Sequence, residues 1–236
     1  GGFMTSSRVT LALEITADKL LLAKASCMGI NCMIEPQNPF ANKELTTEER
    51  IVLRAEREAN IEAEKNGGIP TKHSLIKLRK AYDDAGNDFK AAETLEQQNE
   101  IYPNPEDYNL IGVYYHNSGN KDKAVEFFER AIEHNPNDYW PNFNLGNTLF
   151  YKDPQRARKH LNKAYELYPS EPCINILLGR LDKNEGKTVE AKEKFQIAYD
   201  KYEQRWKANS LSDTDYDWFA SVAEELGKRD KAYELR

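Results

Sequence analysis

The sequence predicts a mainly α-helical protein in which a solenoid of antiparallel helix pairs follows a small β segment and a linking helix. Three observations lead to this prediction. Prolines recur at Pro103, Pro136 and Pro169, each 33 residues after the last, and such a period is typical of stacked helix pairs. Glycine and alanine recur at matching places in each period. The first 66 residues lack the period and contain β-favouring runs.

Composition agrees with a helical protein that has a charged surface. The 236 residues are 39% hydrophobic and 31% charged, with a net charge of -6. This charge provides no basic footprint, so we expect neither nucleic acid nor a membrane surface as a partner. The longest apolar run, from Leu20 to Ala23, is far too short to cross a bilayer. Residues 1–7 resemble an added tag or a linker and carry no signal-peptide pattern.

Cysteine usage favours a reducing, cytoplasmic setting. The chain has three cysteines, Cys27, Cys32 and Cys173, and an odd number in a chain of this length argues for free thiols. Cys27 and Cys32 flank a short loop, but two thiols are only half of a zinc site. Ordinary strand cysteines are the favoured interpretation, and we expect no metal and no cofactor.

The β-favouring runs lie at residues 9–15, 20–25 and 30–34. Three short strands do not form a stable sheet alone. They therefore pair with further strands, pack on the helices, or pair with a second copy of the chain, which would make a homodimer.

A charged linking helix follows these runs. Thr46 as N-cap and Glu49 three residues later form a capping-box pattern. The helix should continue to Asn66 and end at Gly67-Gly68.

Five short segments follow one another in this part of the chain: Glu14-Ile15, Ala17-Asp18-Lys19, Leu20-Leu21-Leu22-Ala23, Ile30-Asn31-Cys32-Met33-Ile34 and Leu45-Thr46-Thr47-Glu48-Glu49. Their order resembles the end of the peptide-binding β-domain and the first lid helix of the DnaK-type seventy-kilodalton heat-shock chaperones. Lys19 departs from the family's usual turn glycine, and repeats replace the lid beyond Gly68. The family's ATPase domain and cleft strands would lie upstream, so neither activity is assigned to a residue here.

One period of the downstream sequence contains Tyr108, Ile111, Gly112, Tyr115, Gly119, Ala124, Phe128, Ala131 and Pro136. With these residues it resembles the tetratricopeptide repeat. Two antiparallel helices that cross closely need small residues at the contact, here Gly112 and Ala124, and large residues beside it. Gly119 suits a turn with positive φ, and Pro136 ends the second helix.

The other copies depart from this pattern in ways that predict local changes. Arg79 replaces the glycine of the first copy, and the third has a shortened turn capped by Asp153-Pro154. Glu203 replaces the closing proline of the fourth, so its second helix should continue toward Trp206. The last copy stops at Arg236 within its second helix, from which we expect a continuing chain or a capping helix.

The predicted division is therefore a chaperone-like β remnant at 1–43, a helix and linker at 44–70, and a repeat array at 71–236. Within the array the predicted copies are about 72–105, 106–138, 139–171, 172–209 and a truncated 213–236.

The first helices of such an array line its concave face, and we expect a protein or peptide partner to bind there. The candidate partner-binding residues are Asn109, Leu110, Val113, His116, Phe143, Asn144, Asn147, Leu177, Arg180, Lys183 and Trp218. Asparagine amides bond a peptide backbone in both directions, and aromatic side chains anchor it. As an alternative, Leu110, Phe143 and Leu177 pack only against neighbouring repeats.

No catalytic motif accompanies these repeats. The four histidines are scattered, and the sequence has no phosphate-binding glycine loop and no nucleophile elbow, so we do not expect an enzyme. The preferred hypothesis is the carboxy-terminal arm of a DnaK-like chaperone that recruits clients or partners. The alternative is a stand-alone scaffold that assembles a complex unrelated to folding.

Overall fold

The computed structural model describes two compact units, Gly1–Ala85 and Gly86–Arg236. It describes all residues from 45 to 236 and, before them, the backbone of three strands; residues 1–9, 16–20, 28–29 and 38–44 lie outside the described part. Two of the predicted strand starts, Val9 and Leu20, and the turn at 17–19 therefore lie outside the described residues. The predicted division at 1–43, 44–70 and 71–236 stays a prediction.

The strands of the first unit are β1 (Thr10–Ile15), β2 (Leu21–Cys27) and β3 (Ile30–Gln37), which pair antiparallel in the order β1-β2-β3. Cys27 pairs with Ile30, and Cys32 pairs with Ala25. The two cysteines are therefore not directly opposite each other. The chaperone resemblance depends on side chains that are not described for these strands, so it stays a prediction.

Helices α1 (Thr47–Lys65) and α2 (Lys72–Asp84) complete the first unit. The predicted capping box is confirmed, because Thr46 Oγ1 accepts from Glu49 N at 3.2 Å and Thr46 N donates to Glu49 Oε2 at 2.7 Å. The following glycines have φ of 70° and 89°, which ends α1.

Helices α1 and α2 are also held together by side chains. The hydroxyl of Thr71, the N-cap of α2, donates to Glu62 Oε2 at 2.6 Å. The Tyr82 hydroxyl donates to the Glu56 carboxylate. These bonds tie α1 to α2 at both ends of α2.

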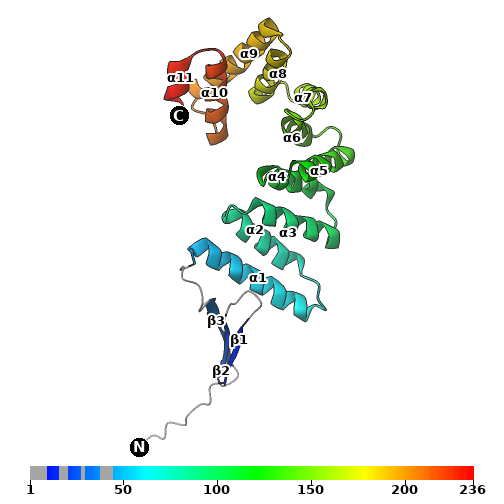
Figure 1. Ribbon diagram of the computed structural model, residues 1–236, viewed down its shortest axis with the longest axis vertical. Helices are drawn as coiled ribbons and strands as arrows, with labels where there is room; N and C mark the ends of the chain where they lie inside the picture. The colour runs from blue at the N-terminus through cyan, green and yellow to red at the C-terminus, as the bar shows by residue number, and fades with distance from the viewer. Residues whose placement is uncertain (1–9, 16–20, 28–29, 38–44) are drawn as a thin grey trace, which may run out of the picture. The chain divides into compact units, whose positions relative to one another are not determined.

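The second unit is an all-helical stack, with one 3-10 turn, η1 (Pro105–Asp107). Its helices pair as α4 with α5, α6 with α7, α8 with α9 and α10 with α11, in chain order (Figure 1). The helices are α3 (Asp88–Ile101), α4 (Tyr108–Asn117), α5 (Lys121–His134), α6 (Tyr139–Leu149), α7 (Pro154–Leu167), α8 (Pro172–Asn184), α9 (Thr188–Lys207), α10 (Asp213–Glu225) and α11 (Arg229–Glu234). The predicted stack of antiparallel helix pairs is confirmed here. The first predicted copy, 72–105, combines helices of different units and stays a prediction.

Each pair from α4 to α9 closes on a glycine of its first helix. A Cβ added to Gly112 would lie 2.6 Å from Phe128 Cε1, and one added to Gly146 would lie 2.7 Å from Leu161 Cγ. Gly179 meets Phe195 in the same way, at 2.7 Å. A side chain at any of these three glycines would overlap with the second helix of its pair. This explains why glycine occupies this position in the repeat.

The turns within the pairs show how the chain reverses. Gly119 has φ of 85° in the α4–α5 turn, as predicted. The shortened α6–α7 turn has no glycine; Asp153 caps α7 by accepting from Arg156 N at 3.0 Å, and Pro154 occupies the first helical turn. A side-chain cap thus replaces the glycine.

The predicted extension of α9 is confirmed, since the helix runs to Lys207. Its added turns bring Tyr202, which is fully buried, into a stacked contact with Phe219 of α10, with ring centroids 5.9 Å apart. The longer helix therefore builds the core shared with α10 and α11.

Gly112→Leu should destabilise the second unit by about 1–3 kcal/mol, because the added side chain must displace the buried Phe128 ring. Chemical denaturation followed by circular dichroism measures the change. Adding Phe128→Ala to Gly112→Leu should restore part of the loss by making room, whereas Gln155→Leu, at an exposed helical position, should change stability little. Equal stability of Gly112→Leu and wild type would contradict the close-contact account.

Candidate protein-binding face

The predicted partner-binding residues all lie on the first helices of successive pairs. We call this set the first-helix face: Asn109, Leu110, Val113 and His116 on α4, Phe143, Asn144 and Asn147 on α6, Leu177, Arg180 and Lys183 on α8, and Trp218 on α10. Within the described stack these helices follow one another along the second unit (Figure 1).

Side-chain exposure divides the face. Leu110 is 38% exposed and Lys183 is exposed, whereas Phe143 and Leu177 are only 7% and 3% exposed. The other members are half-buried. Phe143 stacks on Tyr139, with ring centroids 5.8 Å apart. The burial of Phe143 and Leu177 agrees with the alternative that they pack within the stack, and they offer little surface to a partner.

Polar members of the face bond to neighbouring first helices. Asn144 Nδ2 donates to Asn109 Oδ1 at 3.0 Å, which links α6 to α4. Arg180 Nε donates to Glu225 Oε1 at 2.9 Å, and Lys183 Nζ donates to Glu225 Oε2 at 2.8 Å, which links α8 to α10. The Arg180 guanidinium also donates to the Ser221 hydroxyl at 2.5 Å. Four predicted binding residues thus hold the repeats together.

Burial and these two cations act in opposite directions on Glu225. Burial raises the pKa of the Glu225 carboxyl, but the hydrogen bonds from Lys183 and Arg180 outweigh it, so the pKa lies below its ordinary value. Glu225 therefore remains a carboxylate at neutral pH.

His116 belongs to a second polar chain between α4 and α6. Its Nδ1 lies 2.7 Å from Thr148 Oγ1, which donates to Asn144 O at 2.7 Å. Lys121 Nζ lies 2.9 Å from His116 Nε2. Because the ammonium can only donate, Nε2 accepts and Nδ1 carries the proton in the neutral ring. Burial, and then the charge of Lys121, lower the pKa of His116.

Trp218 is half-buried and packs against the core cluster that contains Phe219, so three members of the face remain available for a partner. Leu110 and Val113 present apolar surface on α4, and Asn147 is half-buried on α6. Within residues 45–236, the Asn147 side-chain amide makes no hydrogen bond that the structure shows, so both its donors and its acceptor are open. These groups resemble the mixture of anchors and amides that binds an extended peptide.

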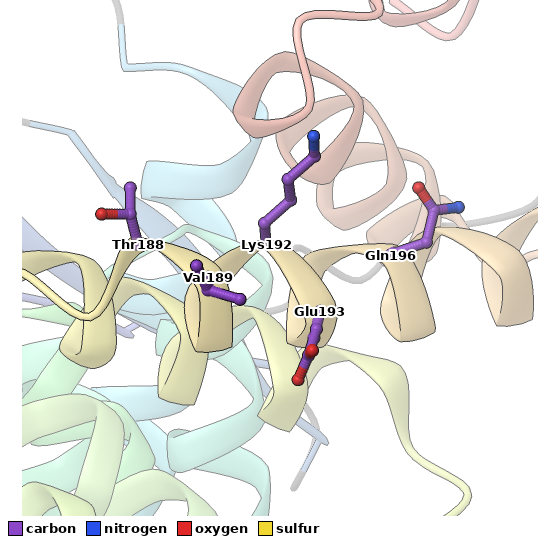
Figure 2. Close-up of a pocket in the computed structure, with 5 residues that line it drawn as sticks. All are labelled: Thr188, Val189, Lys192, Glu193 and Gln196. Carbon is purple, nitrogen blue, oxygen red and sulfur yellow. The ribbon is translucent and has the colours of Figure 1, made fainter.

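A hollow elsewhere on the second unit does not coincide with this face. It is lined by residues of α9 alone, namely Thr188, Val189, Lys192, Glu193 and Gln196. Figure 2 shows Lys192 and Gln196 pointing to one side of the helix and Glu193 to the other. A small-molecule site needs polar groups that converge in an enclosed space, and this helix surface lacks that arrangement.

Other kinds of site have no support in the described part of the chain. Over those residues, no group of three or more His, Cys, Asp or Glu side chains is placed to hold a metal ion. None of the described helices is both long and apolar enough to cross a membrane. Cys173 is buried, and burial raises the pKa of its thiol to about 12, which makes it a poor nucleophile.

Comparison with known proteins matches residues 105–138, which hold η1, α4 and α5, to the tetratricopeptide repeat family. These residues are thus similar in sequence to one tetratricopeptide repeat. The match falls on the copy whose glycine contact and turn are described above.

Solved structures share the fold of the repeat stack. A crystal structure of MamA is 20% identical, with a TM-score of 0.55, and the match covers 70% of this chain and 99% of that chain. MamA from Desulfovibrio magneticus RS-1 is 17% identical, with a TM-score of 0.52, over 70% and 90%. PilW, a widely conserved type IV pilus biogenesis factor, is 20% identical, with a TM-score of 0.52, over 78% and 82%. At these identities the likeness shows the fold alone.

The sequence analysis missed a group of aromatic residues at the start of α6. Tyr139 and Trp140 follow the N-cap Asp138, and Trp140 is 57% exposed. The signal was present as two adjacent aromatic residues beside a helix-capping aspartate.

His116 should make stability depend on pH. Its folded pKa is depressed, so the unfolded chain binds the proton more readily, and stability is lost as pH falls below the ordinary value of about 6.5. We expect the free energy of unfolding to fall between pH 7.5 and 5.5, and His116→Gln to reduce this slope. Denaturation at each pH measures it.

A matched comparison is His160→Gln, since burial, followed by Lys159 and Arg156, also lowers the pKa of His160. Each single variant should remove a separate part of the slope, and the double variant should remove both. An unchanged slope in His116→Gln would contradict the neutral, hydrogen-bonded state of this ring.

Proposed function

We propose that this chain is a protein-binding scaffold that holds a protein or peptide partner on the first-helix face. The proposal depends on two side chains of this face: Leu110, which is apolar and exposed, and Asn147, whose amide is available for hydrogen bonds. Hydrogen bonds between the first helices hold the surrounding surface in place. Because these hydrogen bonds already fix side chains of the face, the chain loses little conformational freedom when a partner binds. More of the contact energy then appears as affinity.

The tetratricopeptide match and the solenoid fold support this proposal at a general level. Stacked helix pairs provide an extended surface that binds other proteins. PilW is a pilus biogenesis factor. Its fold is the only one of its properties on which the proposal depends. Catalysis has no place in the proposal.

The narrower proposal is a carboxy-terminal arm of a DnaK-like chaperone. It depends mainly on residues 14–34, whose side chains the structure does not describe. The feature described in detail is the Thr46–Glu49 capping box, which occurs at the start of many unrelated helices. The stand-alone scaffold is therefore the preferred proposal, and the cytoplasmic location and the strand-paired homodimer stay predictions.

The experiment must avoid residues that brace the stack. Asn109 and Arg180 bond to neighbouring helices, so their loss would disturb the surface as well as any binding. We therefore place a photo-crosslinking amino acid at Leu110 and, as a matched control, at Gln155, an exposed residue of the second helix α7.

Light-induced crosslinking in cells of the source should give a discrete product from position 110 and none from position 155. Asn147→Ala, introduced with the crosslinker at 110, should reduce that product several-fold, the effect of removing a hydrogen-bonding group from a binding site. Products of equal yield at 110 and 155, or none at 110, would place the interface elsewhere.

A further inference from the structure

A group of four aromatic residues forms an exposed cluster where one helix pair meets the next. Tyr139 lies 4.9 Å from Trp140 and 5.7 Å from Tyr168 between ring centroids, and Phe143 lies 6.4 Å from Trp140. We call this set the aromatic edge. Trp140 is 57% exposed and Tyr168 is 51% exposed. Two large rings thus face solvent side by side with a ring that contacts both.

Contacts with buried residues hold the cluster in place. Phe143 is buried, and the Tyr139 hydroxyl lies 3.8 Å from Cys173 Sγ of α8. Burial, followed by the neighbouring thiol, raises the pKa of Tyr139, so the ring keeps its hydroxyl proton. Fixed rings lose little side-chain entropy on binding, which favours a contact surface.

The aromatic edge lies beside the connections between helix pairs. Tyr139 and Trp140 begin α6, and Tyr168 follows the end of α7. Because successive helices are antiparallel, every connection from a second helix to the next first helix lies on the same edge of the stack. Residues 102–107, 135–138 and 168–171 are three such connections.

These three connections carry negative charge only. They contain the carboxylates Glu106, Asp107, Asp138 and Glu171 and no lysine or arginine. The turns within the pairs, on the opposite edge, differ, because each has a lysine in it or directly after it: Lys121, Lys152, Lys187 and Lys228. The connections on the edge that exposes Trp140 and Tyr168 thus contain no cation of their own. Cations of α9 reach only the 168–171 connection, where Lys201 Nζ donates to Pro169 O at 2.6 Å and Arg205 pairs with Glu171.

Two carboxylates of the connections on this edge remain partly available. Asp138 Oδ1 accepts from the backbone N–H of Trp140 at 3.0 Å, so its charge lies at the start of α6, beside the backbone of Trp140. Among residues 45–236, the Glu106 carboxylate is paired only with the His134 ring, at 3.3 Å. Glu171 is already paired with Arg205 at 3.2 Å. Asp138 and Glu106 therefore leave negative charge for a cation brought by a partner.

Some other aromatic rings of the second unit are already covered by cations of the chain, whereas Tyr151 and Tyr233 are exposed without such a contact. Lys228 lies 3.3 Å from the ring centroid of Tyr199, and Lys231 lies 3.1 Å from that of Trp206. Across the described residues 45–236, no lysine or arginine lies over Trp140 or Tyr168. The aromatic edge thus offers open π-faces beside unneutralised carboxylates, an arrangement that suits a cation.

We propose that the aromatic edge binds an arginine-rich segment of another protein. A guanidinium stacks on the face of Trp140 or Tyr168, while Asp138 and Glu106 provide the opposite charge. Arginine suits this surface better than lysine because its planar group stacks on rings and is weakly hydrated. The inference goes beyond the proposed function, because it concerns a partner of defined chemistry and a surface that shares only the buried Phe143 with the first-helix face.

The test uses the full chain and three labelled peptides of equal length with alternating sequence: (Arg-Gly)6, (Lys-Gly)6 and (Glu-Gly)6. Fluorescence anisotropy should show the tightest binding for the arginine peptide, weaker binding for the lysine peptide and none for the glutamate peptide. Raising the salt concentration should weaken the arginine complex, because the attraction is partly electrostatic. No binding of the arginine peptide, or equal binding of the glutamate peptide, would overturn the proposal.

Trp140→Ala should weaken binding of the arginine peptide about tenfold, the loss typical of truncating an aromatic anchor, and Trp140→Phe should weaken it less. Glu106→Gln with Asp138→Asn should also weaken it, and Asn at 138 keeps the helix cap. The matched control, Glu193→Gln with Asp200→Asn on α9, removes the same charge elsewhere.

The control should bind like wild type. If it weakens binding as much as the edge variant, the attraction is a general effect of net charge and the proposal fails. Circular dichroism checks that each variant is folded. If Trp140→Ala disturbs the fold, Trp140→Phe and the charge variant still decide the outcome. Unchanged affinity in both would overturn the assignment to this edge.

Discussion

The close crossing of two helices at a glycine is the constraint on which the repeat stack depends. At Gly112, Gly146 and Gly179 the missing side chain lets Phe128, Leu161 or Phe195 of the second helix fill the contact. This fixes the distance between the helices of each pair. Successive first helices then approach closely enough for side chains such as Asn109 and Asn144 to bond. The polar bracing of the first-helix face therefore follows from a steric feature of the pairs.

Bracing and binding compete for the same side chains on this face. Arg180, Lys183 and Asn144 project from first helices, where a partner would lie, yet their polar groups are engaged within the stack. What remains for a partner is a smaller set around Leu110 and Asn147. A polar side chain that stabilises the array is thus not available to a partner. In this chain, many polar side chains of the first-helix face bond within the stack.

Features that depend on a few neighbouring residues could be predicted from the sequence. The Thr46–Glu49 cap, the Gly119 turn, the Asp153 cap and the length of α9 are set by local backbone preferences, and all agree with the structure. Periodicity also identified which helices form the face. It did not identify which side chains face a neighbour, because partners such as Arg180 and Glu225 lie 45 residues apart.

The same reason accounts for Phe143 and Leu177. The position of a residue on a helix gives only the direction in which its side chain points. Whether that side chain is exposed depends on how the adjacent repeat packs against it. In α6 and α8 these side chains are buried within the stack. The aromatic edge was missed for the converse reason, since Trp140 at the start of α6 stays exposed.

The length of α9 also limits how this array can change during evolution. Helix pairs α4–α5 and α6–α7 have similar lengths, so another pair of that length could replace either one if it kept bonds such as Asn109–Asn144. Helix α9 instead reaches back to the preceding connection, where Arg205 pairs with Glu171, and forward to α10, where it pairs with Asp215. Side chains of α9 thus contact both the connection that precedes α8 and the following helix α10. A duplication there would break contacts in both directions, so the central pairs are the interchangeable part of the array and the α8–α10 region is not.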